Sequence, residues 1–162
     1  MGYSLWFGEF DVVVEKADRY VRGTARTPDH EGPLNSTLDR GASCRPGYSA
    51  WGDFTRRVGL YDLFFDKSTE CLICQHPGVV AVTEDDHAKF EAALAAHKQR
   101  HHIDFKRIEE KVEAAERNPH TPFHERYANV SVAEWDALRL RWLTYWSRYV
   151  LDHCEYPSFA NS

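Results

Sequence analysis

Apolar residues in the first half of the chain cluster in short runs that predict β-strands. Residues 3–14 are aromatic and β-branched with little polar interruption, which is typical of a strand buried on both faces. Two further runs, 60–66 and 70–75, flank a turn-like Asp-Lys-Ser-Thr stretch and predict a β-hairpin. Residues 79–82 form another short apolar run after a Pro-Gly break. We therefore expect a small, mainly antiparallel sheet.

The second half of the chain has the periodicity of helices. Thr83, followed by three acidic residues, can cap a helix, and apolar or histidine residues then recur every three or four positions. This pattern predicts either one helix over 84–117 or two helices with a break near 102–104. Ser131 opens a second capping box, and the periodicity after it predicts a helix over 132–153.

The remaining segments connect these elements. Residues 23–47 are rich in Gly, Pro and polar side chains and predict a long irregular segment. Ser49 can cap a short helix over 50–58, which Gly59 would end. The sequence thus predicts a single α+β domain spanning 1–162, in which a small antiparallel sheet packs against two long C-terminal helices.

Length and composition narrow the class of protein. The chain has 162 residues and a mean hydropathy of −0.58. No apolar run approaches the roughly 18 residues of a membrane span, and the first residues lack the basic region of a signal peptide. Four scattered cysteines are too few for a disulfide scaffold. We expect a cytoplasmic protein with reduced thiols and no membrane association.

The charge argues against nucleic acid as the main partner. The chain carries 20 Lys and Arg against 25 Asp and Glu, a formal net charge of −5. The acidity is mild and evenly spread, whereas a protein that holds a nucleic-acid backbone needs a concentrated positive surface.

Paired histidines are the first candidate for chemistry. His97 and His101 stand four residues apart on a predicted helix, and His120 and His124 repeat that spacing in the loop beyond it. Together they could hold a zinc ion, or three could bind it and leave a position for water. The HExxH signature is absent, because position 98 is Lys. The competing interpretation is that the first pair packs and the second pair lies on the surface.

Other candidates have weaker support. Cys71, Cys74 and His76 have the spacing of half a zinc site, although the apolar residues between the cysteines suit a core strand better. Cys44, next to an arginine in the irregular segment, could act as a nucleophile. The stretch 29–31 places a histidine between two carboxylates, but without a second element to hold it this stretch is an ordinary polar loop.

The last predicted helix is unusually aromatic. Phe, Trp and Tyr make up 14% of the chain, and three of its five tryptophans fall within this helix. A helix with aromatic residues on more than one face either lies between two layers or exposes one face to a partner. Trp, Tyr and Arg dominate the energetics of protein–protein interfaces. The candidate partner-binding residues are Trp135, Trp142, Tyr145, Arg148 and Tyr149.

Two functional hypotheses follow. The preferred one is a small cytosolic, non-catalytic binding protein without a cofactor, which acts through an unidentified protein partner as inhibitors, immunity proteins and accessory subunits do. The alternative is a zinc-dependent hydrolytic enzyme that uses the histidine cluster, with Glu125 or Asp104 as general base. In an enzyme of that kind, a chelator would abolish activity and lower the melting temperature.

Overall fold

A computed structural model describes residues 2–10, 25–70 and 78–161 of the chain. Within these residues, four strands form one antiparallel sheet in the order β2-β1-β4-β3. The strands are β1 (Leu5–Glu9), β2 (Ser43–Cys44), β3 (Gly78–Ala81) and β4 (Pro157–Asn161). The predicted α+β class and mainly antiparallel sheet are confirmed.

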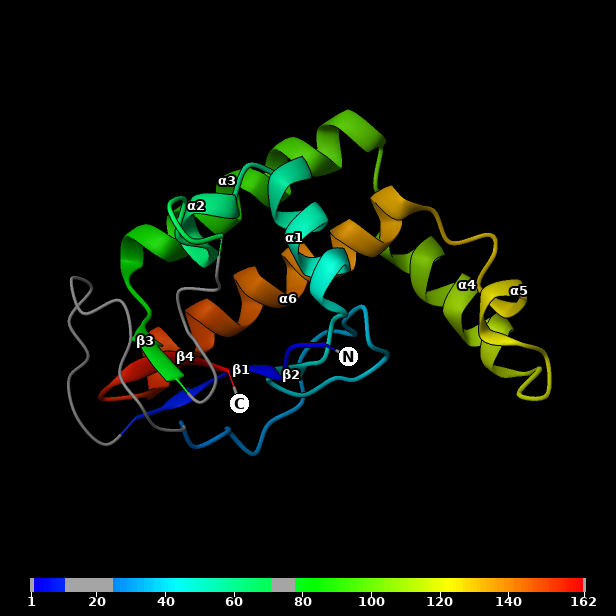
Figure 1. Ribbon diagram of the computed structural model, residues 1–162. Coiled ribbons are helices and arrows are strands. Elements are labelled where there is room, and N and C mark those ends of the chain that lie inside the picture. Colours follow the sequence, from blue (N-terminus) through cyan, green and yellow to red (C-terminus); the bar gives the residue numbers. More distant parts are fainter. Residues whose placement is uncertain (1, 11–24, 71–77, 162) are drawn as a thin grey trace.

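Six helices accompany the sheet in the described part of the chain. They are α1 (Tyr48–Arg57), α2 (Tyr61–Phe64), α3 (Glu84–His101), α4 (Phe105–Glu116), α5 (Phe123–Arg126) and α6 (Val132–His153). Helix α6 runs through the middle of the molecule, with the sheet at one end and α4 and α5 at the other (Figure 1). It contacts β1 and β4 directly, and α3 packs along it. The two long helices of the sequence prediction are therefore α3 and α6.

The two faces of the sheet have different coverings. On one face, Leu5, Phe7 and Phe159 belong to the main core, which includes the buried side of α6. On the other face, Val79 and Ala160 form a small cluster with Phe10 and Ala25. This alternation follows from the two-residue period of a strand. The main core therefore lies between one face of the sheet and the buried side of α6.

Strand β4 was missing from the prediction, in which Pro157 and a polar end simply closed the chain. The strand pairs with β1 on one side and with β3 on the other, and Phe7 lies opposite Phe159. Its Pro-Ser-Phe-Ala-Asn sequence contains no β-branched residue. Its extended conformation therefore depends on pairing with two neighbours, which no local pattern can reveal.

The predicted hairpin over 60–66 and 70–75 is wrong in its first strand. Residues 61–64 form the helical turn α2, and 71–75 lie outside the described residues. Helix α1 ends at a left-handed Gly59 (φ 76°), and the amide of Leu60 bonds back to the carbonyl of Thr55 at 2.8 Å. That glycine stop was predicted correctly, but α1 begins one residue before Ser49, with Gly47 as its N-cap.

The predicted helices form, and the chain breaks between the first two of them near residues 102–104. Both capping boxes form: the Asp86 amide donates to Thr83 Oγ1 at 3.2 Å, and the Glu134 amide donates to Ser131 Oγ at 3.1 Å. A left-handed His102 (φ 51°) separates α3 from α4, and Asp104 caps the new helix. The single helix over 84–117 is therefore replaced by the alternative of two helices.

Helix α4 is joined to α6 by a half-buried ion pair. Lys111 Nζ lies 2.7 Å from Glu134 Oε1 and 3.0 Å from the carbonyl of Asn129. Burial raises the pKa of Glu134, but hydrogen bonds from Lys111 and Ser131 outweigh it, so the pKa of Glu134 is lowered. This pair gives the attachment of α4 a pH dependence.

We expect Lys111→Met to lower the free energy of unfolding by about 1–2 kcal/mol at neutral pH. A carboxyl group with a lowered folded-state pKa stabilises the protein fully above its unfolded-state pKa, and this stabilisation is lost as the pH falls through the folded-state value. The difference between the two proteins should therefore shrink as the pH falls below the ordinary pKa range of a glutamate carboxyl. Urea unfolding at several pH values measures it, and a difference that stays constant on acidification would exclude the ion pair as its cause.

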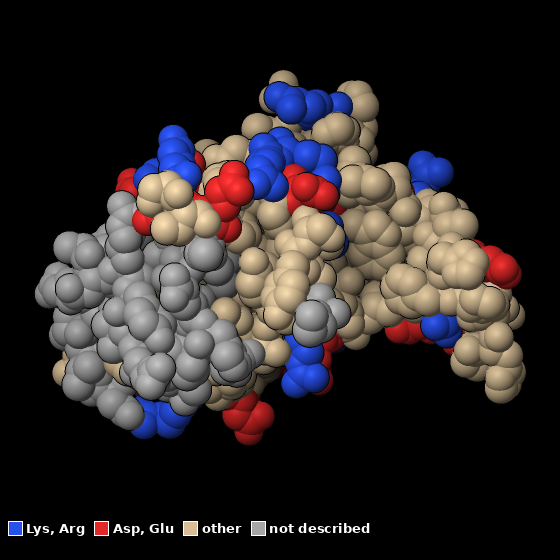
Figure 2. All heavy atoms as spheres, viewed as in Figure 1, with Lys and Arg blue, Asp and Glu red and all other residues tan. Residues whose placement is uncertain are grey.

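The surface in Figure 2 mixes both signs of charge. Lys, Arg, Asp and Glu lie close together along the edge formed by α1, α2 and α3, whereas uncharged side chains cover most of the centre of this face. Within the described ranges, none of the helices is both long and apolar enough to cross a membrane.

Candidate partner-binding surface

The five residues predicted to bind a partner do not share one surface. Trp142 is fully buried and packs against Phe7, with ring centroids 5.1 Å apart. Its indole N–H donates to the carbonyl of Gly41 at 3.1 Å. Helix α6 lies between layers along much of its length, so an aromatic residue on its buried side belongs to the core. A partner therefore cannot contact Trp142 in the folded protein.

Trp135 lies at the other end of α6 from the remaining members. It is half-buried and packs against Tyr127, with ring centroids 5.9 Å apart. Ten residues separate Trp135 from Tyr145, which is about 15 Å along a helix axis. Trp135 thus belongs to the α4–α5 end of the molecule and to a different surface.

Tyr145 and Tyr149 do lie together, and His30 joins them. The ring of His30 stacks on Tyr149 with centroids 4.6 Å apart and planes 13° apart, and Tyr149 stacks on His153 at 4.2 Å and 14°. The His30 Nε2 and the Tyr145 hydroxyl are 2.5 Å apart. We call Tyr145, His30, Tyr149 and His153 the aromatic stack. The two histidines are exposed and the two tyrosines are half-buried.

The irregular segment brings His30 to α6 through a close backbone approach. A Cβ atom at Gly32 would lie 2.8 Å from Tyr145 Cε1 and 3.0 Å from a ring carbon of Trp146. Glycine is needed here because the chain passes directly over these rings. The amide of Gly32 donates to the carbonyl of Arg40 at 2.6 Å, which closes the segment on itself. The stack is therefore held by the backbone as well as by ring contacts.

Arg148 borders the stack and is held in place. Its guanidinium makes two hydrogen bonds with the Glu84 carboxylate, at 2.8 and 2.9 Å, and lies 2.9 Å from Asp152. Hydrogen bonding to Glu84 raises the pKa of Arg148 and lowers the pKa of Glu84. The guanidinium is partly exposed, and these two carboxylates balance its charge.

The histidines proposed as metal ligands are not assembled into a site. The rings of His97 and His101 are neighbours, 4.5 Å between centroids, but His97 Nε2 is hydrogen-bonded to the carbonyl of Ala133 at 2.7 Å. His120 and His124 are exposed near α5. Among the described residues, there is no group of three or more His, Cys, Asp or Glu that could hold a metal ion. The shared helical spacing placed two rings together but could not supply a third ligand.

The two proposed general bases are likewise engaged elsewhere or exposed. Asp104 caps α4 by accepting from the amide of Arg107 at 3.3 Å. Glu125 lies on the surface beside His124, at 3.7 Å. Neither carboxylate is brought to the His97 and His101 pair by a contact in the described part of the chain.

Cys44 lies in a buried polar region that the sequence did not reveal. Its thiol is 1% exposed, with Ser36 Oγ and Thr37 Oγ1 each 3.9 Å away. Burial raises the pKa of the Cys44 thiol despite these hydrogen bonds, which keeps it protonated and unreactive. The predicted half zinc site, Cys71, Cys74 and His76, lies outside the described residues.

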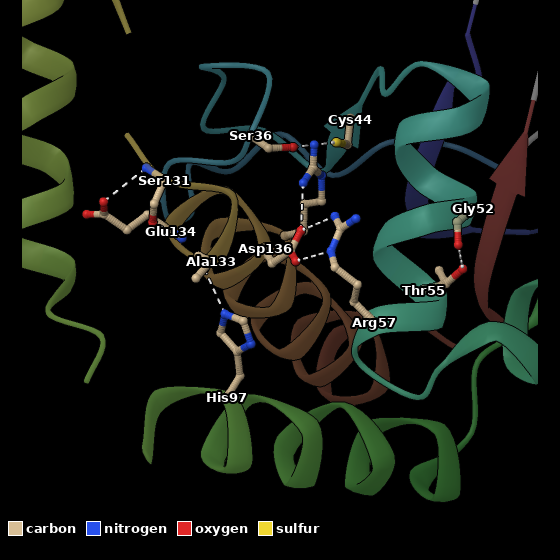
Figure 3. Close-up of polar contacts among 11 residues, drawn as sticks. Ser36, Cys44, Gly52, Thr55, Arg57, His97, Ser131, Ala133, Glu134 and Asp136 are labelled. Atoms are coloured by element: carbon tan, nitrogen blue, oxygen red, sulfur yellow. Dashed lines mark hydrogen bonds and ion pairs between the residues drawn. The ribbon is translucent and has the colours of Figure 1, made fainter. Parts of the chain in front are cut away.

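Next to Cys44, a buried ion network joins α1 to α6 (Figure 3). Asp136 is 1% exposed and receives two hydrogen bonds from Arg57, at 2.8 and 2.9 Å. Arg139 donates to the same carboxylate at 2.9 Å, and burial lowers the pKa of Arg139. The three side chains pair with one another, so this network holds α1 against α6.

The sequence did not predict that His30 belongs to the same surface as the tyrosines of α6. The stretch 29–31 was recognised as an imidazole between carboxylates, but its anchor on α6 is more than a hundred residues away along the chain. The only local signal was the glycine that follows it, Gly32, which permits the close approach.

Comparisons of the chain with known protein families, curated proteins and solved structures found no match to any of them.

Proposed function

We propose that this protein is a non-catalytic binding protein of the cytoplasm, which acts through a protein partner that docks on the aromatic stack. The observation that carries the proposal is the stack itself: four rings, Tyr145, His30, Tyr149 and His153, aligned on the surface beside Arg148. Tyr and Arg are the residue types that contribute most at protein interfaces. Inhibitors, immunity proteins and accessory subunits are proteins of this kind.

The stack suits binding because its rings are ordered before a partner arrives. A side chain that is fixed in the free protein loses little conformational entropy when it is covered. Tyr149 is stacked on both sides, by His30 and His153, and Arg148 is fixed by two carboxylates. Each ring also keeps a polar edge that a partner can hydrogen-bond.

Two residues that the sequence offered for chemistry, His97 and Cys44, are engaged in the fold. His97 is bonded to a backbone carbonyl, and Cys44 is a buried thiol whose pKa is raised. Each is engaged in contacts that stabilise the fold. Tyr145 and Tyr149, in contrast, remain partly open to solvent.

We expect Tyr149→Ala and His30→Ala to weaken partner binding by about tenfold or more, the effect of removing an interface anchor. The matched control is Phe123→Ala, which removes an aromatic ring of 55% exposure at the α5 end of the molecule. Proteins captured by each variant from cells of the source organism would be quantified by mass spectrometry, with circular dichroism to verify folding. A partner retained equally by all variants would show that the stack is not the binding surface.

A further inference from the structure

Helices α4 and α5 lie at the end of α6 farthest from the sheet (Figure 1). We call residues 103–130, which contain both helices, the arm. Neither of its helices packs along another helix of the described chain in the way that α3 packs along α6. The arm is therefore held mainly by side-chain contacts on its inner surface.

The apolar contacts of the arm are separate from the main core. Among the described residues, the main core includes α6 from Leu140 onward and no residue of the arm. The arm packs in two smaller clusters, one that joins Val112 to Leu34 and one that joins Ile108 to Leu138. Because these clusters share no buried residue with the main core, their loss would leave the main core intact.

In the described part of the chain, two ion pairs join the arm to α6. Lys111 Nζ lies 2.7 Å from Glu134 Oε1, and the Arg141 guanidinium lies 3.2 Å from Glu109 Oε1. Arg141 also lies over the ring of Phe105, 4.3 Å from its centroid. Partly exposed ion pairs contribute little free energy each. The attachment of the arm is thus weaker than the apolar packing of the main core.

The ends of the arm let it move without disturbing the helices beside it. Helix α3 ends at the left-handed His102, whose amide bonds back to the carbonyl of Lys98. Helix α6 begins with a capping box that uses only Ser131 and Glu134. Asp104 caps α4 within the arm itself. Each helix next to an end of the arm is therefore capped by its own residues.

We propose that the arm opens from α6 as one unit, turning about its two ends, while the sheet, α3 and the main core stay folded. Units that rest on small, separate apolar clusters open at a lower free energy than the main core of a protein. Opening breaks both ion pairs and uncovers Ile108, Val112 and Leu138. The arm is thus a lid over the first turns of α6, and this inference is independent of the proposed function.

The test is native-state hydrogen exchange of the full chain, resolved amide by amide by NMR. The amides of α4 should share one protection factor, lower than that of the amides in the middle of α6. Phe7→Leu weakens the main core and should lower the protection of β1 and the middle of α6 by about tenfold. It should leave α4 unchanged, because the open form keeps the main core. Val150→Ala gives the same comparison from α6.

A lysine pair tests the attachment. Lys111→Met should lower the protection of the α4 amides by about tenfold. The matched control is Lys89→Met, which removes the exposed Lys89–Asp85 pair on α3 and should leave α4 unchanged.

Two results would overturn the proposal. Equal protection of α4 and α6, lowered equally by Phe7→Leu, would mean that the arm separates only when the whole protein unfolds. Equal effects of the two lysine variants on α4 would mean that the contact of Lys111 with Glu134 does not hold the arm. Neither result bears on the aromatic stack, whose residues lie outside the arm.

Discussion

Replacing Trp142 by alanine is expected to lower the free energy of unfolding by about 3–5 kcal/mol, the cost of removing a large aromatic side chain from a core. The indole is fully buried, packs on Phe7 and donates a hydrogen bond to Gly41. Its loss would leave a cavity between α6 and the sheet and an unpaired carbonyl. Chemical denaturation followed by circular dichroism measures the change.

Trp142→Phe is the matched control, because it keeps most of the buried volume and loses the N–H group. We expect it to cost clearly less than the alanine variant. If Trp142→Ala instead melted like the unchanged protein, Trp142 would lie at the surface, and the position of α6 in the core would be wrong.

The second large effect is expected at Asp136. Asp136→Ala should lower the free energy of unfolding by about 3–5 kcal/mol, because it leaves the buried guanidinium of Arg139 without its counter-charge. The side chains of Asp136 and Arg139 are 2% and 14% exposed. Arg57 is 42% exposed and can turn to solvent, so most of the cost arises at Arg139. Urea unfolding at neutral pH measures it.

A double variant separates charge from packing at this network. Asp136→Leu with Arg139→Met replaces the buried pair by apolar side chains of similar size, and such replacements are often neutral or stabilising. We expect the double variant to recover most of the stability lost in Asp136→Ala. A double variant as unstable as the single one would mean that the pair acts through its hydrogen-bond geometry rather than through balanced charge.

The sequence predicted those elements whose signals are local. Thr83 and Ser131 start α3 and α6 as expected, because a capping box involves only residues within one helical turn. Gly59 ends α1, because a left-handed backbone favours glycine wherever it occurs. The α+β class follows from these signals together with the apolar run that forms β1.

The errors fall where distant contacts decide the structure. The run 60–65 is apolar enough for a strand, but Phe64 and Phe65 are both buried, and one helical turn brings them into the core. Strand β4 has weak strand propensity and forms because β1 and β3 lie on either side of it. Short apolar runs carry no information about which of these contacts will form.

The candidate site was predictable in part. Tyr145, Tyr149 and Arg148 were identified from residue type and helical position, and the structure gathers them on one surface with His30. Trp142 was included because helical periodicity alone does not tell which aromatic face is buried.

The most direct test of the central claim is site-specific photo-crosslinking in cells of the source organism. A photoreactive phenylalanine analogue would replace His153, the exposed end of the stack, and, in a control protein, Phe123. Docking on the stack predicts one discrete protein adduct from position 153 and none of that mass from position 123. The absence of an adduct at position 153, or the same adduct at both positions, would contradict the assignment of the stack as the binding surface.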